Sequence, residues 1–311
     1  MLIKMKKNHI MIAVSFVILA FVILFSNPIK IIEVLINANP IFILAAFGVA
    51  LLNILLRVAK WSVLVGVPTR RLIDVQMLGL TISNFTPGKI ADPAKSLILK
   101  AKNNIPVSES LISIIWERVN DVTVMIILSL IGLQFIALDV QTSILSMFGI
   151  GIFVALIAVM MIILFYQKLG RKIFFFLKRF PIMNKLSDDF IDNFYSTSIG
   201  KKKIIISFII TLVAWVLEGV VMLFVLMSLG LGANFVLLAG MISLSVLIGV
   251  ASSLPGGIGS TEFVMILLLG VIGIGAEAAA IVLVYRFLTF WFGALLGGVS
   301  MVHLSRKGVK I

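Results

Sequence analysis

Ser-Asn-Phe-Thr-Pro-Gly-Lys-Ile at residues 83–90 and Ala-Ser-Ser-Leu-Pro-Gly-Gly-Ile at residues 251–258 contain the two Pro-Gly dipeptides of this chain. Pro255 follows Pro87 by 168 residues (255 − 87), and Arg286 follows Arg118 by the same 168 residues (286 − 118). Two similar halves, each with an apolar segment broken by Pro-Gly, are typical of transporters built from internal repeats. The sequence therefore predicts a duplicated membrane protein.

The composition places the whole chain in a membrane. Hydrophobic residues make up 61% of the 311 residues and charged residues 13%, and the mean hydropathy is +1.22. These values lie far from those of soluble domains. Six segments approach or reach the roughly 20 apolar residues that cross a bilayer: 10–25, 41–56, 111–138, 144–166, 204–229 and 278–302. We expect an all-α polytopic protein with one integral membrane domain, residues 1–311.

The distribution of basic residues predicts the orientation of these spans. Lysines precede the first span, basic residues follow the second and the last, and 167–203 forms a basic segment between the fourth and fifth. The other connections contain almost no Lys or Arg, so the positive-inside rule places both termini in the cytoplasm. We interpret 10–25 as a retained signal anchor of the cell membrane and 167–203 as an amphipathic segment on the cytoplasmic leaflet. The net charge of +13 thus reflects membrane orientation, and we expect no nucleic-acid partner.

The Pro-Gly segments are expected to form two re-entrant hairpins. Both flanks of 75–101 are basic, so this segment must return to the cytoplasmic side, whereas both flanks of 235–274 lack Lys and Arg. The hairpins then enter from opposite faces, which makes the two halves, about 41–138 and 204–303, an inverted-topology repeat. Irregular backbone at membrane depth must be buried in protein or line a wet cavity, so the tips should meet near the midplane. The alternative is a surface element at 77–85 and ordinary kinked spans within 235–274.

Ionisable residues inside the predicted spans and hairpins are the candidates for function, because such residues are costly in a membrane. Glu117 and Asp121 lie four residues apart on one helical face and can pair with a cation from another element. Arg57 and Lys60 are interpreted as side chains that snorkel from the end of the second span, and Glu218 is isolated in the fifth. An alternative assigns Arg118 and Arg286 only to salt bridges that hold the hairpins.

Together these residues predict a site for a phosphate-bearing lipid. Glycine backbones at both tips, at Gly88, Gly256, Gly257 and Gly259, offer N–H groups beside helix N-termini, which favour anions. Arginine and lysine side chains clasp phosphate by charge-assisted hydrogen bonds, and nearby carboxylates orient those cations or bind an amine or hydroxyls. The candidate substrate-binding residues are Lys89, Asp92, Glu117, Arg118, Asp121, Gly256, Gly257, Gly259, Glu262 and Arg286. With no cysteine, and with His9 and His303 at opposite ends of the chain, we expect no metal, no cofactor and no catalytic residue.

The motifs resemble the flippase-like family related to the transmembrane region of lysylphosphatidylglycerol synthases. Residues 254–262, Leu-Pro-Gly-Gly-Ile-Gly-Ser-Thr-Glu, are similar to its Pro-Gly-Gly-x-Gly-x-x-Glu motif, and 84–95 with 117–121 are similar to its N-terminal motif. Asp92 follows Ala91 where the family usually has Gly-Glu. The resemblance covers about residues 41–302 and implies movement of lipid headgroups between leaflets, of phospholipids or of polyprenyl-phosphate sugars. It implies no aminoacyl transfer, because that activity belongs to a soluble domain in the fused synthases.

Two other functions remain open at this point. The protein could be an intramembrane enzyme that acts on a lipid-linked phosphate, with Glu262, Glu117 or Asp121 as acid or base. It could also be a non-transporting membrane partner of a glycosyltransferase or another lipid-modifying enzyme. We expect a flippase-like protein that is not an enzyme.

Overall fold

A computed structural model describes residues 32–33, 36–89, 91–137, 151, 171–172, 199–275 and 277–309. Within these ranges every regular element is helical, so the predicted all-α class is confirmed. The predicted spans 10–25 and 144–166 lie outside the described residues, except for residue 151. Most of the basic segment 167–203 also lies outside them.

Four long helices are apolar and long enough to cross a membrane. They are α3 (Pro40–Val65), α6 (Val107–Ala137), α10 (Lys201–Met227) and the continuous rod of α13 (Ala278–Arg286), η3 (Phe287–Trp291) and α14 (Phe292–Arg306). The η3 segment is a π-helical turn. These helices coincide with four of the predicted spans. Helix α3, however, continues nine residues beyond the expected end at residue 56, because Lys60 is buried inside the protein and Arg57 is largely covered by it.

Two pairs of short helices form the broken hairpins. The first pair is α4 (Thr69–Asn84) and α5 (Ala94–Asn103), joined through the turn η1 (Pro87–Lys89). The second pair is α11 (Phe235–Ala251) and α12 (Ser260–Val271), joined through η2 (Pro255–Gly257). Gly88 and Gly256 both adopt the left-handed conformation, with φ of 56° and 64°. Glycine permits this reversal and the preceding proline stops the helix, so the sequence motif explains both breaks.

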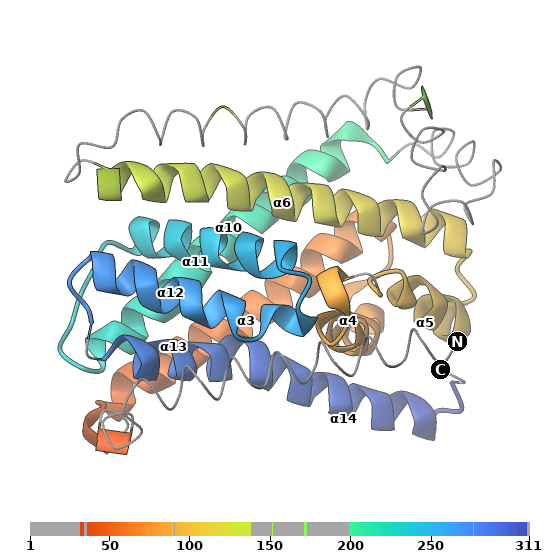
Figure 1. Ribbon diagram of the computed structural model, residues 1–311. Coiled ribbons are helices and arrows are strands. Elements are labelled where there is room, and N and C mark those ends of the chain that lie inside the picture. Colours follow the sequence, from red (N-terminus) through yellow and green to blue (C-terminus); the bar gives the residue numbers. More distant parts are fainter. Residues whose placement is uncertain are drawn as a thin grey trace, which may run out of the picture.

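The two hairpins start from opposite ends of the bundle and meet at their tips. The amide of Asn39, before α3, donates to Ser228 O after α10 at 2.8 Å, which marks the end where α11 begins. At the other end, Lys102 of α5 pairs with Asp74 of α4 at 3.1 Å. In Figure 1, α6 runs the full length of the bundle, α11 and α12 occupy the left half, and α4 and α5 occupy the right half. The turns η1 and η2 contact each other in the middle.

The helix bounds recur with the offset found in the sequence. Shifted by 168 residues, α4 covers 237–252, beside α11 at 235–251. The same shift places α5 at 262–271, beside α12 at 260–271. The offset deduced from Pro-Gly and arginine therefore also relates the helices of the two hairpins.

Close helix packing fixes α11 between α6 and α10. A Cβ at Gly240 of α11 would lie 2.6 Å from the Cα of Gly132 and 2.5 Å from Leu128 O, both on α6. On the other side, a Cβ at Gly219 of α10 would meet Ala239 of α11 at 2.8 Å. Small residues allow such close approach of helices in membranes, so the second hairpin is held by direct backbone contact with two long helices.

Candidate substrate-binding site

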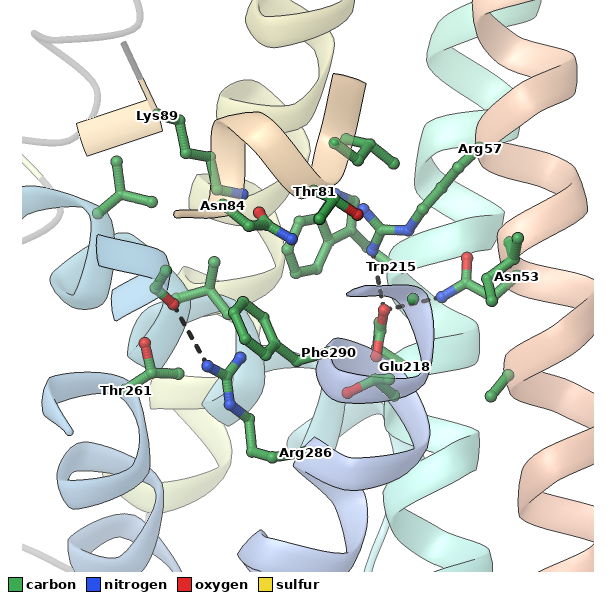
Figure 2. Close-up of a pocket in the computed structure, with 18 of the residues that line it drawn as sticks. Asn53, Arg57, Thr81, Asn84, Lys89, Trp215, Glu218, Thr261, Arg286 and Phe290 are labelled. Carbon is green, nitrogen blue, oxygen red and sulfur yellow. Dashed lines mark hydrogen bonds and ion pairs between the residues drawn. The ribbon is translucent and has the colours of Figure 1, made fainter. Parts of the chain in front are cut away.

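A cavity of about 130 Å³ lies where the two hairpin tips meet α3, α6, α10 and the α13–α14 rod. One buried water needs about 10–15 Å³, so the cavity has room for a polar group with several atoms. Figure 2 shows side chains from both hairpins and from three long helices directed toward it. Its polar lining consists of Asn53, Arg57, Thr81, Asn84, Lys89, Arg118, Glu218, Thr261, Tyr285, Arg286 and Thr289.

Arg286 ties α13 to the second hairpin tip. Its Nε donates to Glu262 Oε1 at 2.5 Å and its Nη2 donates to Gly256 O at 3.3 Å. The second oxygen of Glu262 accepts the amide of Gly259 at 2.6 Å, at the start of α12, where a carboxylate is favoured. The guanidinium also lies 4.2 Å from the centre of the Phe290 ring. Arg286 therefore lines the cavity in a fixed position (Figure 2).

Arg118 occupies the equivalent place in the first half and is less enclosed. Its Nε lies 2.5 Å from Asp92 Oδ2, and its Nη1 lies 3.3 Å from Asp121 Oδ2. The Nε–H is not aligned with a carboxylate oxygen, so the short contact with Asp92 is an ion pair without a well-formed hydrogen bond. The side chain is 26% exposed and lines the cavity, which leaves donors available to a ligand.

A buried network behind Arg118 connects the first hairpin to α3 and α6. Lys60 Nζ lies 2.5 Å from Asp121 and 3.7 Å from Glu117, and Lys95 Nζ lies 2.5 Å from Glu117. The prediction that Glu117 and Asp121 share a cation from another element is thus confirmed. Gln76 bridges Lys95 and Glu117 at 3.2 Å each. The interpretation that Lys60 snorkels to the membrane interface was wrong. Lys60 is 1% exposed, because Glu117 and Asp121 hold its ammonium group inside the protein.

A third cluster surrounds Glu218. Its Oε1 accepts hydrogen bonds from Asn53 and Arg57, each at 2.8 Å, and its Oε2 accepts the Tyr285 hydroxyl at 2.5 Å. Arg57 therefore pairs within the bundle and does not snorkel to the interface, and Glu218 is not isolated. The Arg57 guanidinium also lies 5.2 Å from the centre of the Trp215 ring.

These partners had a partial signal in the sequence. Asn53, Arg57 and Lys60 are spaced by four and three residues and so share one face of α3. A polar face on an otherwise apolar helix indicates burial against other polar groups.

Lys89 differs from the other cations of the site. Among the described residues, no carboxylate lies within ion-pairing distance of its ammonium group and no hydrogen bond to it is formed. Its backbone is left-handed, with φ of 57°, a conformation that is uncommon for a residue with a side chain. The side chain points from the first hairpin tip into the cavity, near Asn84 (Figure 2).

The structure divides the ten predicted binding residues into two groups. Lys89, Arg118, Gly256 and Arg286 line the cavity. The four acidic residues among the ten lie behind it as partners of cations. Gly257 packs against Gly249, where a Cβ would meet the Gly249 Cα at 3.1 Å. Gly259 caps α12, and its amide is already bonded to Glu262. Asn53, Arg57, Glu218 and Tyr285 line the cavity as well and were not predicted.

Both hairpin tips and both arginine sites lie within a region of the sequence that matches a known family. Residues 11–297 match the family described as the lysylphosphatidylglycerol synthase transmembrane region. The chain belongs to this family. It is a membrane protein whose broken hairpins, buried ion pairs and cavity all fall within the matched residues.

Archaeal membrane proteins are similar to this family member over almost their full length. A UPF0104 membrane protein of Methanothermobacter thermautotrophicus is 26% identical over 325 residues, which cover 94% of this chain and 92% of the relative. The UPF0104 membrane protein PH1989 of Pyrococcus horikoshii is 24% identical over 332 residues, covering 97% and 98%. The UPF0104 membrane protein MJ1595 of Methanocaldococcus jannaschii is 22% identical, covering 99% and 98%.

Proposed function

We propose that the protein binds a phosphate-bearing lipid, a phospholipid or a polyprenyl-phosphate-linked sugar, and moves its headgroup between the two leaflets. The cavity at the meeting point of the two hairpin tips carries this proposal. Arginine side chains from equivalent places in the two halves, Arg118 and Arg286, line it together with Lys89. Guanidinium and ammonium groups in a partly dehydrated cavity bind phosphate oxygens by charge-assisted hydrogen bonds.

The arrangement of the hairpins supports translocation over simple binding. In our proposal both hairpins are re-entrant, enter from opposite faces and form an inverted-topology repeat around a site near the midplane. Transporters with this construction rock one repeat against the other about a fixed site. The contact of η1 with η2 would then be part of the barrier, and the headgroup would pass from one side of the contact to the other while its tail stays in lipid.

Leaflet exchange in reconstituted vesicles tests this function. Fluorescent anionic phospholipids and a polyprenyl-phosphate sugar are the probes, and Arg118→Ala, Arg286→Ala and Glu262→Gln are the variants. A hydrogen bond to a charged group contributes about 1.5–3 kcal/mol, and about 1.4 kcal/mol is a factor of ten, so each arginine variant is expected to slow exchange at least tenfold. Glu262→Gln is expected to slow it because Arg286 loses its main partner.

Arg70→Ala is the matched control, because Arg70 is exposed at the start of α4 and lies outside the cavity. It should leave the exchange rate unchanged. Absence of exchange by correctly folded wild-type protein with every probe would contradict the proposed function, as would equal rates for wild type and all three site variants.

A further inference from the structure

The positive and negative charges of the site are not equal in number. Among the described residues, six cationic side chains are buried or line the cavity: Arg57, Lys60, Lys89, Lys95, Arg118 and Arg286. Five carboxylates are buried with them: Asp92, Glu117, Asp121, Glu218 and Glu262. Six positive and five negative groups leave a formal charge of +1 (6 − 5).

Five of the cations pair one to one with the five carboxylates. The pairs are Arg57 with Glu218 at 2.8 Å, and Lys60 with Asp121, Lys95 with Glu117, Arg118 with Asp92 and Arg286 with Glu262, each at 2.5 Å. The remaining cation is Lys89. The excess positive charge therefore belongs to Lys89, at the tip of the first hairpin.

The predicted spans outside the described residues cannot balance this charge. Segments 10–25 and 144–166 contain no Asp, Glu, Lys or Arg. Among the described residues no carboxylate pairs with Lys89, which leaves its charge to a ligand or to water and counterions. An unpaired charge in a partly dehydrated cavity is unfavourable, and Lys89 additionally has a left-handed backbone, with φ of 57°, that few residues with a side chain adopt. Strain of this kind is found at functional sites.

We propose that the site selects a headgroup with one negative charge, a phosphodiester, over the doubly charged phosphomonoester. This inference rests on the proposed function and specifies its substrate. One negative charge beside Lys89 makes the site neutral, whereas a second would remain uncompensated unless an existing ion pair opened. Arg118 and Arg286 then contribute hydrogen bonds while their charges stay balanced by Asp92 and Glu262.

Substitutions that change the charge by one unit test this selection. Lys89→Asn removes the charge and retains a residue that tolerates the left-handed conformation, while Lys89→Arg retains the charge. Asp92→Asn raises the formal charge of the site to +2 and leaves Arg118 paired with Asp121. The variants are first compared with wild type by thermal unfolding in detergent, so that folded protein is used throughout.

The probes are short-chain phosphatidylglycerol, a phosphodiester, and short-chain phosphatidic acid, a phosphomonoester. Binding is measured at about pH 7.5, where a phosphomonoester with a second pKa near 6, as on phosphorylated side chains, carries close to two negative charges. We expect the wild type and Lys89→Arg to bind phosphatidylglycerol more tightly than phosphatidic acid. Lys89→Asn should weaken this binding at least tenfold, and Asp92→Asn should reverse the preference toward phosphatidic acid.

The binding results distinguish failure of the proposed function from failure of the charge selection. If neither probe binds the wild type, the proposed function fails and this inference fails with it. The charge selection alone is wrong if the wild type binds phosphatidic acid at least as tightly as phosphatidylglycerol. It is also wrong if Lys89→Asn binds phosphatidylglycerol as tightly as the wild type does, or if Asp92→Asn keeps the wild-type preference.

Discussion

Lys95 and Glu117 form an ion pair whose side chains are 0% and 1% exposed. At such burial each charge is stable only because the other compensates it, and removal of one partner leaves a costly unpaired charge. Neither residue lines the cavity. The structure therefore gives Glu117 a positioning role: it holds the first hairpin against α6, so that Lys89 and Arg118 face the cavity.

Glu117→Gln is expected to lower the stability of the folded protein by about 3–5 kcal/mol, the cost of leaving a buried charge unpaired. The double variant with Lys95→Met should recover most of this loss, because both charges are then absent. Thermal unfolding in detergent measures the effect. Glu109→Gln, at an exposed position near the start of α6, is the control and should stay within about 0.5 kcal/mol of wild type. Wild-type stability of Glu117→Gln would contradict the assigned role.

Sequence reasoning identified the charged residues of the first hairpin but not all their partners. The i,i+4 spacing of Glu117 and Asp121 was enough to predict a shared cation. Its identity was not predictable, because Lys60 lies 61 residues from Asp121 and helical periodicity does not say which helices become neighbours. Arg57 illustrates the same limit. The sequence around a cation after an apolar run is the same whether the side chain snorkels to the interface or pairs with a distant carboxylate, here Glu218, 161 residues away.

At the scale of helices, the two hairpins are held by different contacts. Helix α11 approaches α6 through Gly240 and Gly132 and approaches α10 through Gly219. The first hairpin is attached through buried ion pairs, through an apolar cluster that includes Leu78 and Leu99, and through Gly297 of α14, whose added Cβ would lie 2.8 Å from Met77 O. Backbone contacts of this kind leave little room for sliding, so we expect α11 to move with α6 and α10 as one body.

Gly240→Ala should separate α11 from α6, because its Cβ would lie 2.6 Å from the Gly132 Cα. Overpacking of a close contact costs about 1–3 kcal/mol, which would appear as a lower unfolding temperature. Gly270→Ala in α12 is the matched control: no atom lies within 4 Å of its added Cβ, so this change should be neutral or slightly stabilising. Equal unfolding temperatures for the two variants would show that the α6–α11 contact is not tight.

For the whole molecule, the 168-residue offset between the two hairpins could be predicted from very few residues. Two Pro-Gly dipeptides and two arginines gave an offset that the helix bounds of both hairpins follow. Each motif has a local structural role at both tips, since the dipeptide breaks a helix and the arginine meets a nearby carboxylate. The Glu218 cluster has no such counterpart, since Ala50 occupies the equivalent position in the first half (218 − 168), and a repeat-based argument could not find it.

The proposed orientation of the hairpins is testable because the chain contains no cysteine. Single cysteines at Lys100, exposed at the end of α5, and at Gly232, exposed before α11, should react with a membrane-impermeant maleimide from opposite sides. Lys100→Cys should be labelled only after the cytoplasmic side is opened, and Gly232→Cys should be labelled in intact cells. Labelling of both positions from one side would contradict the inverted-topology repeat.

The buried ion pairs also bear on how the chain is made. Each ionisable residue at the centre of a membrane helix costs about 2.5–3.5 kcal/mol to insert, and α6 carries Glu117, Arg118 and Asp121. Their partners Lys60, Asp92 and Lys95 all precede α6 in the chain and so leave the ribosome first. The charges of helix α6 can therefore be neutralised, as the helix enters the bilayer, by segments made before it. Glu262, in contrast, is made 24 residues before its partner Arg286.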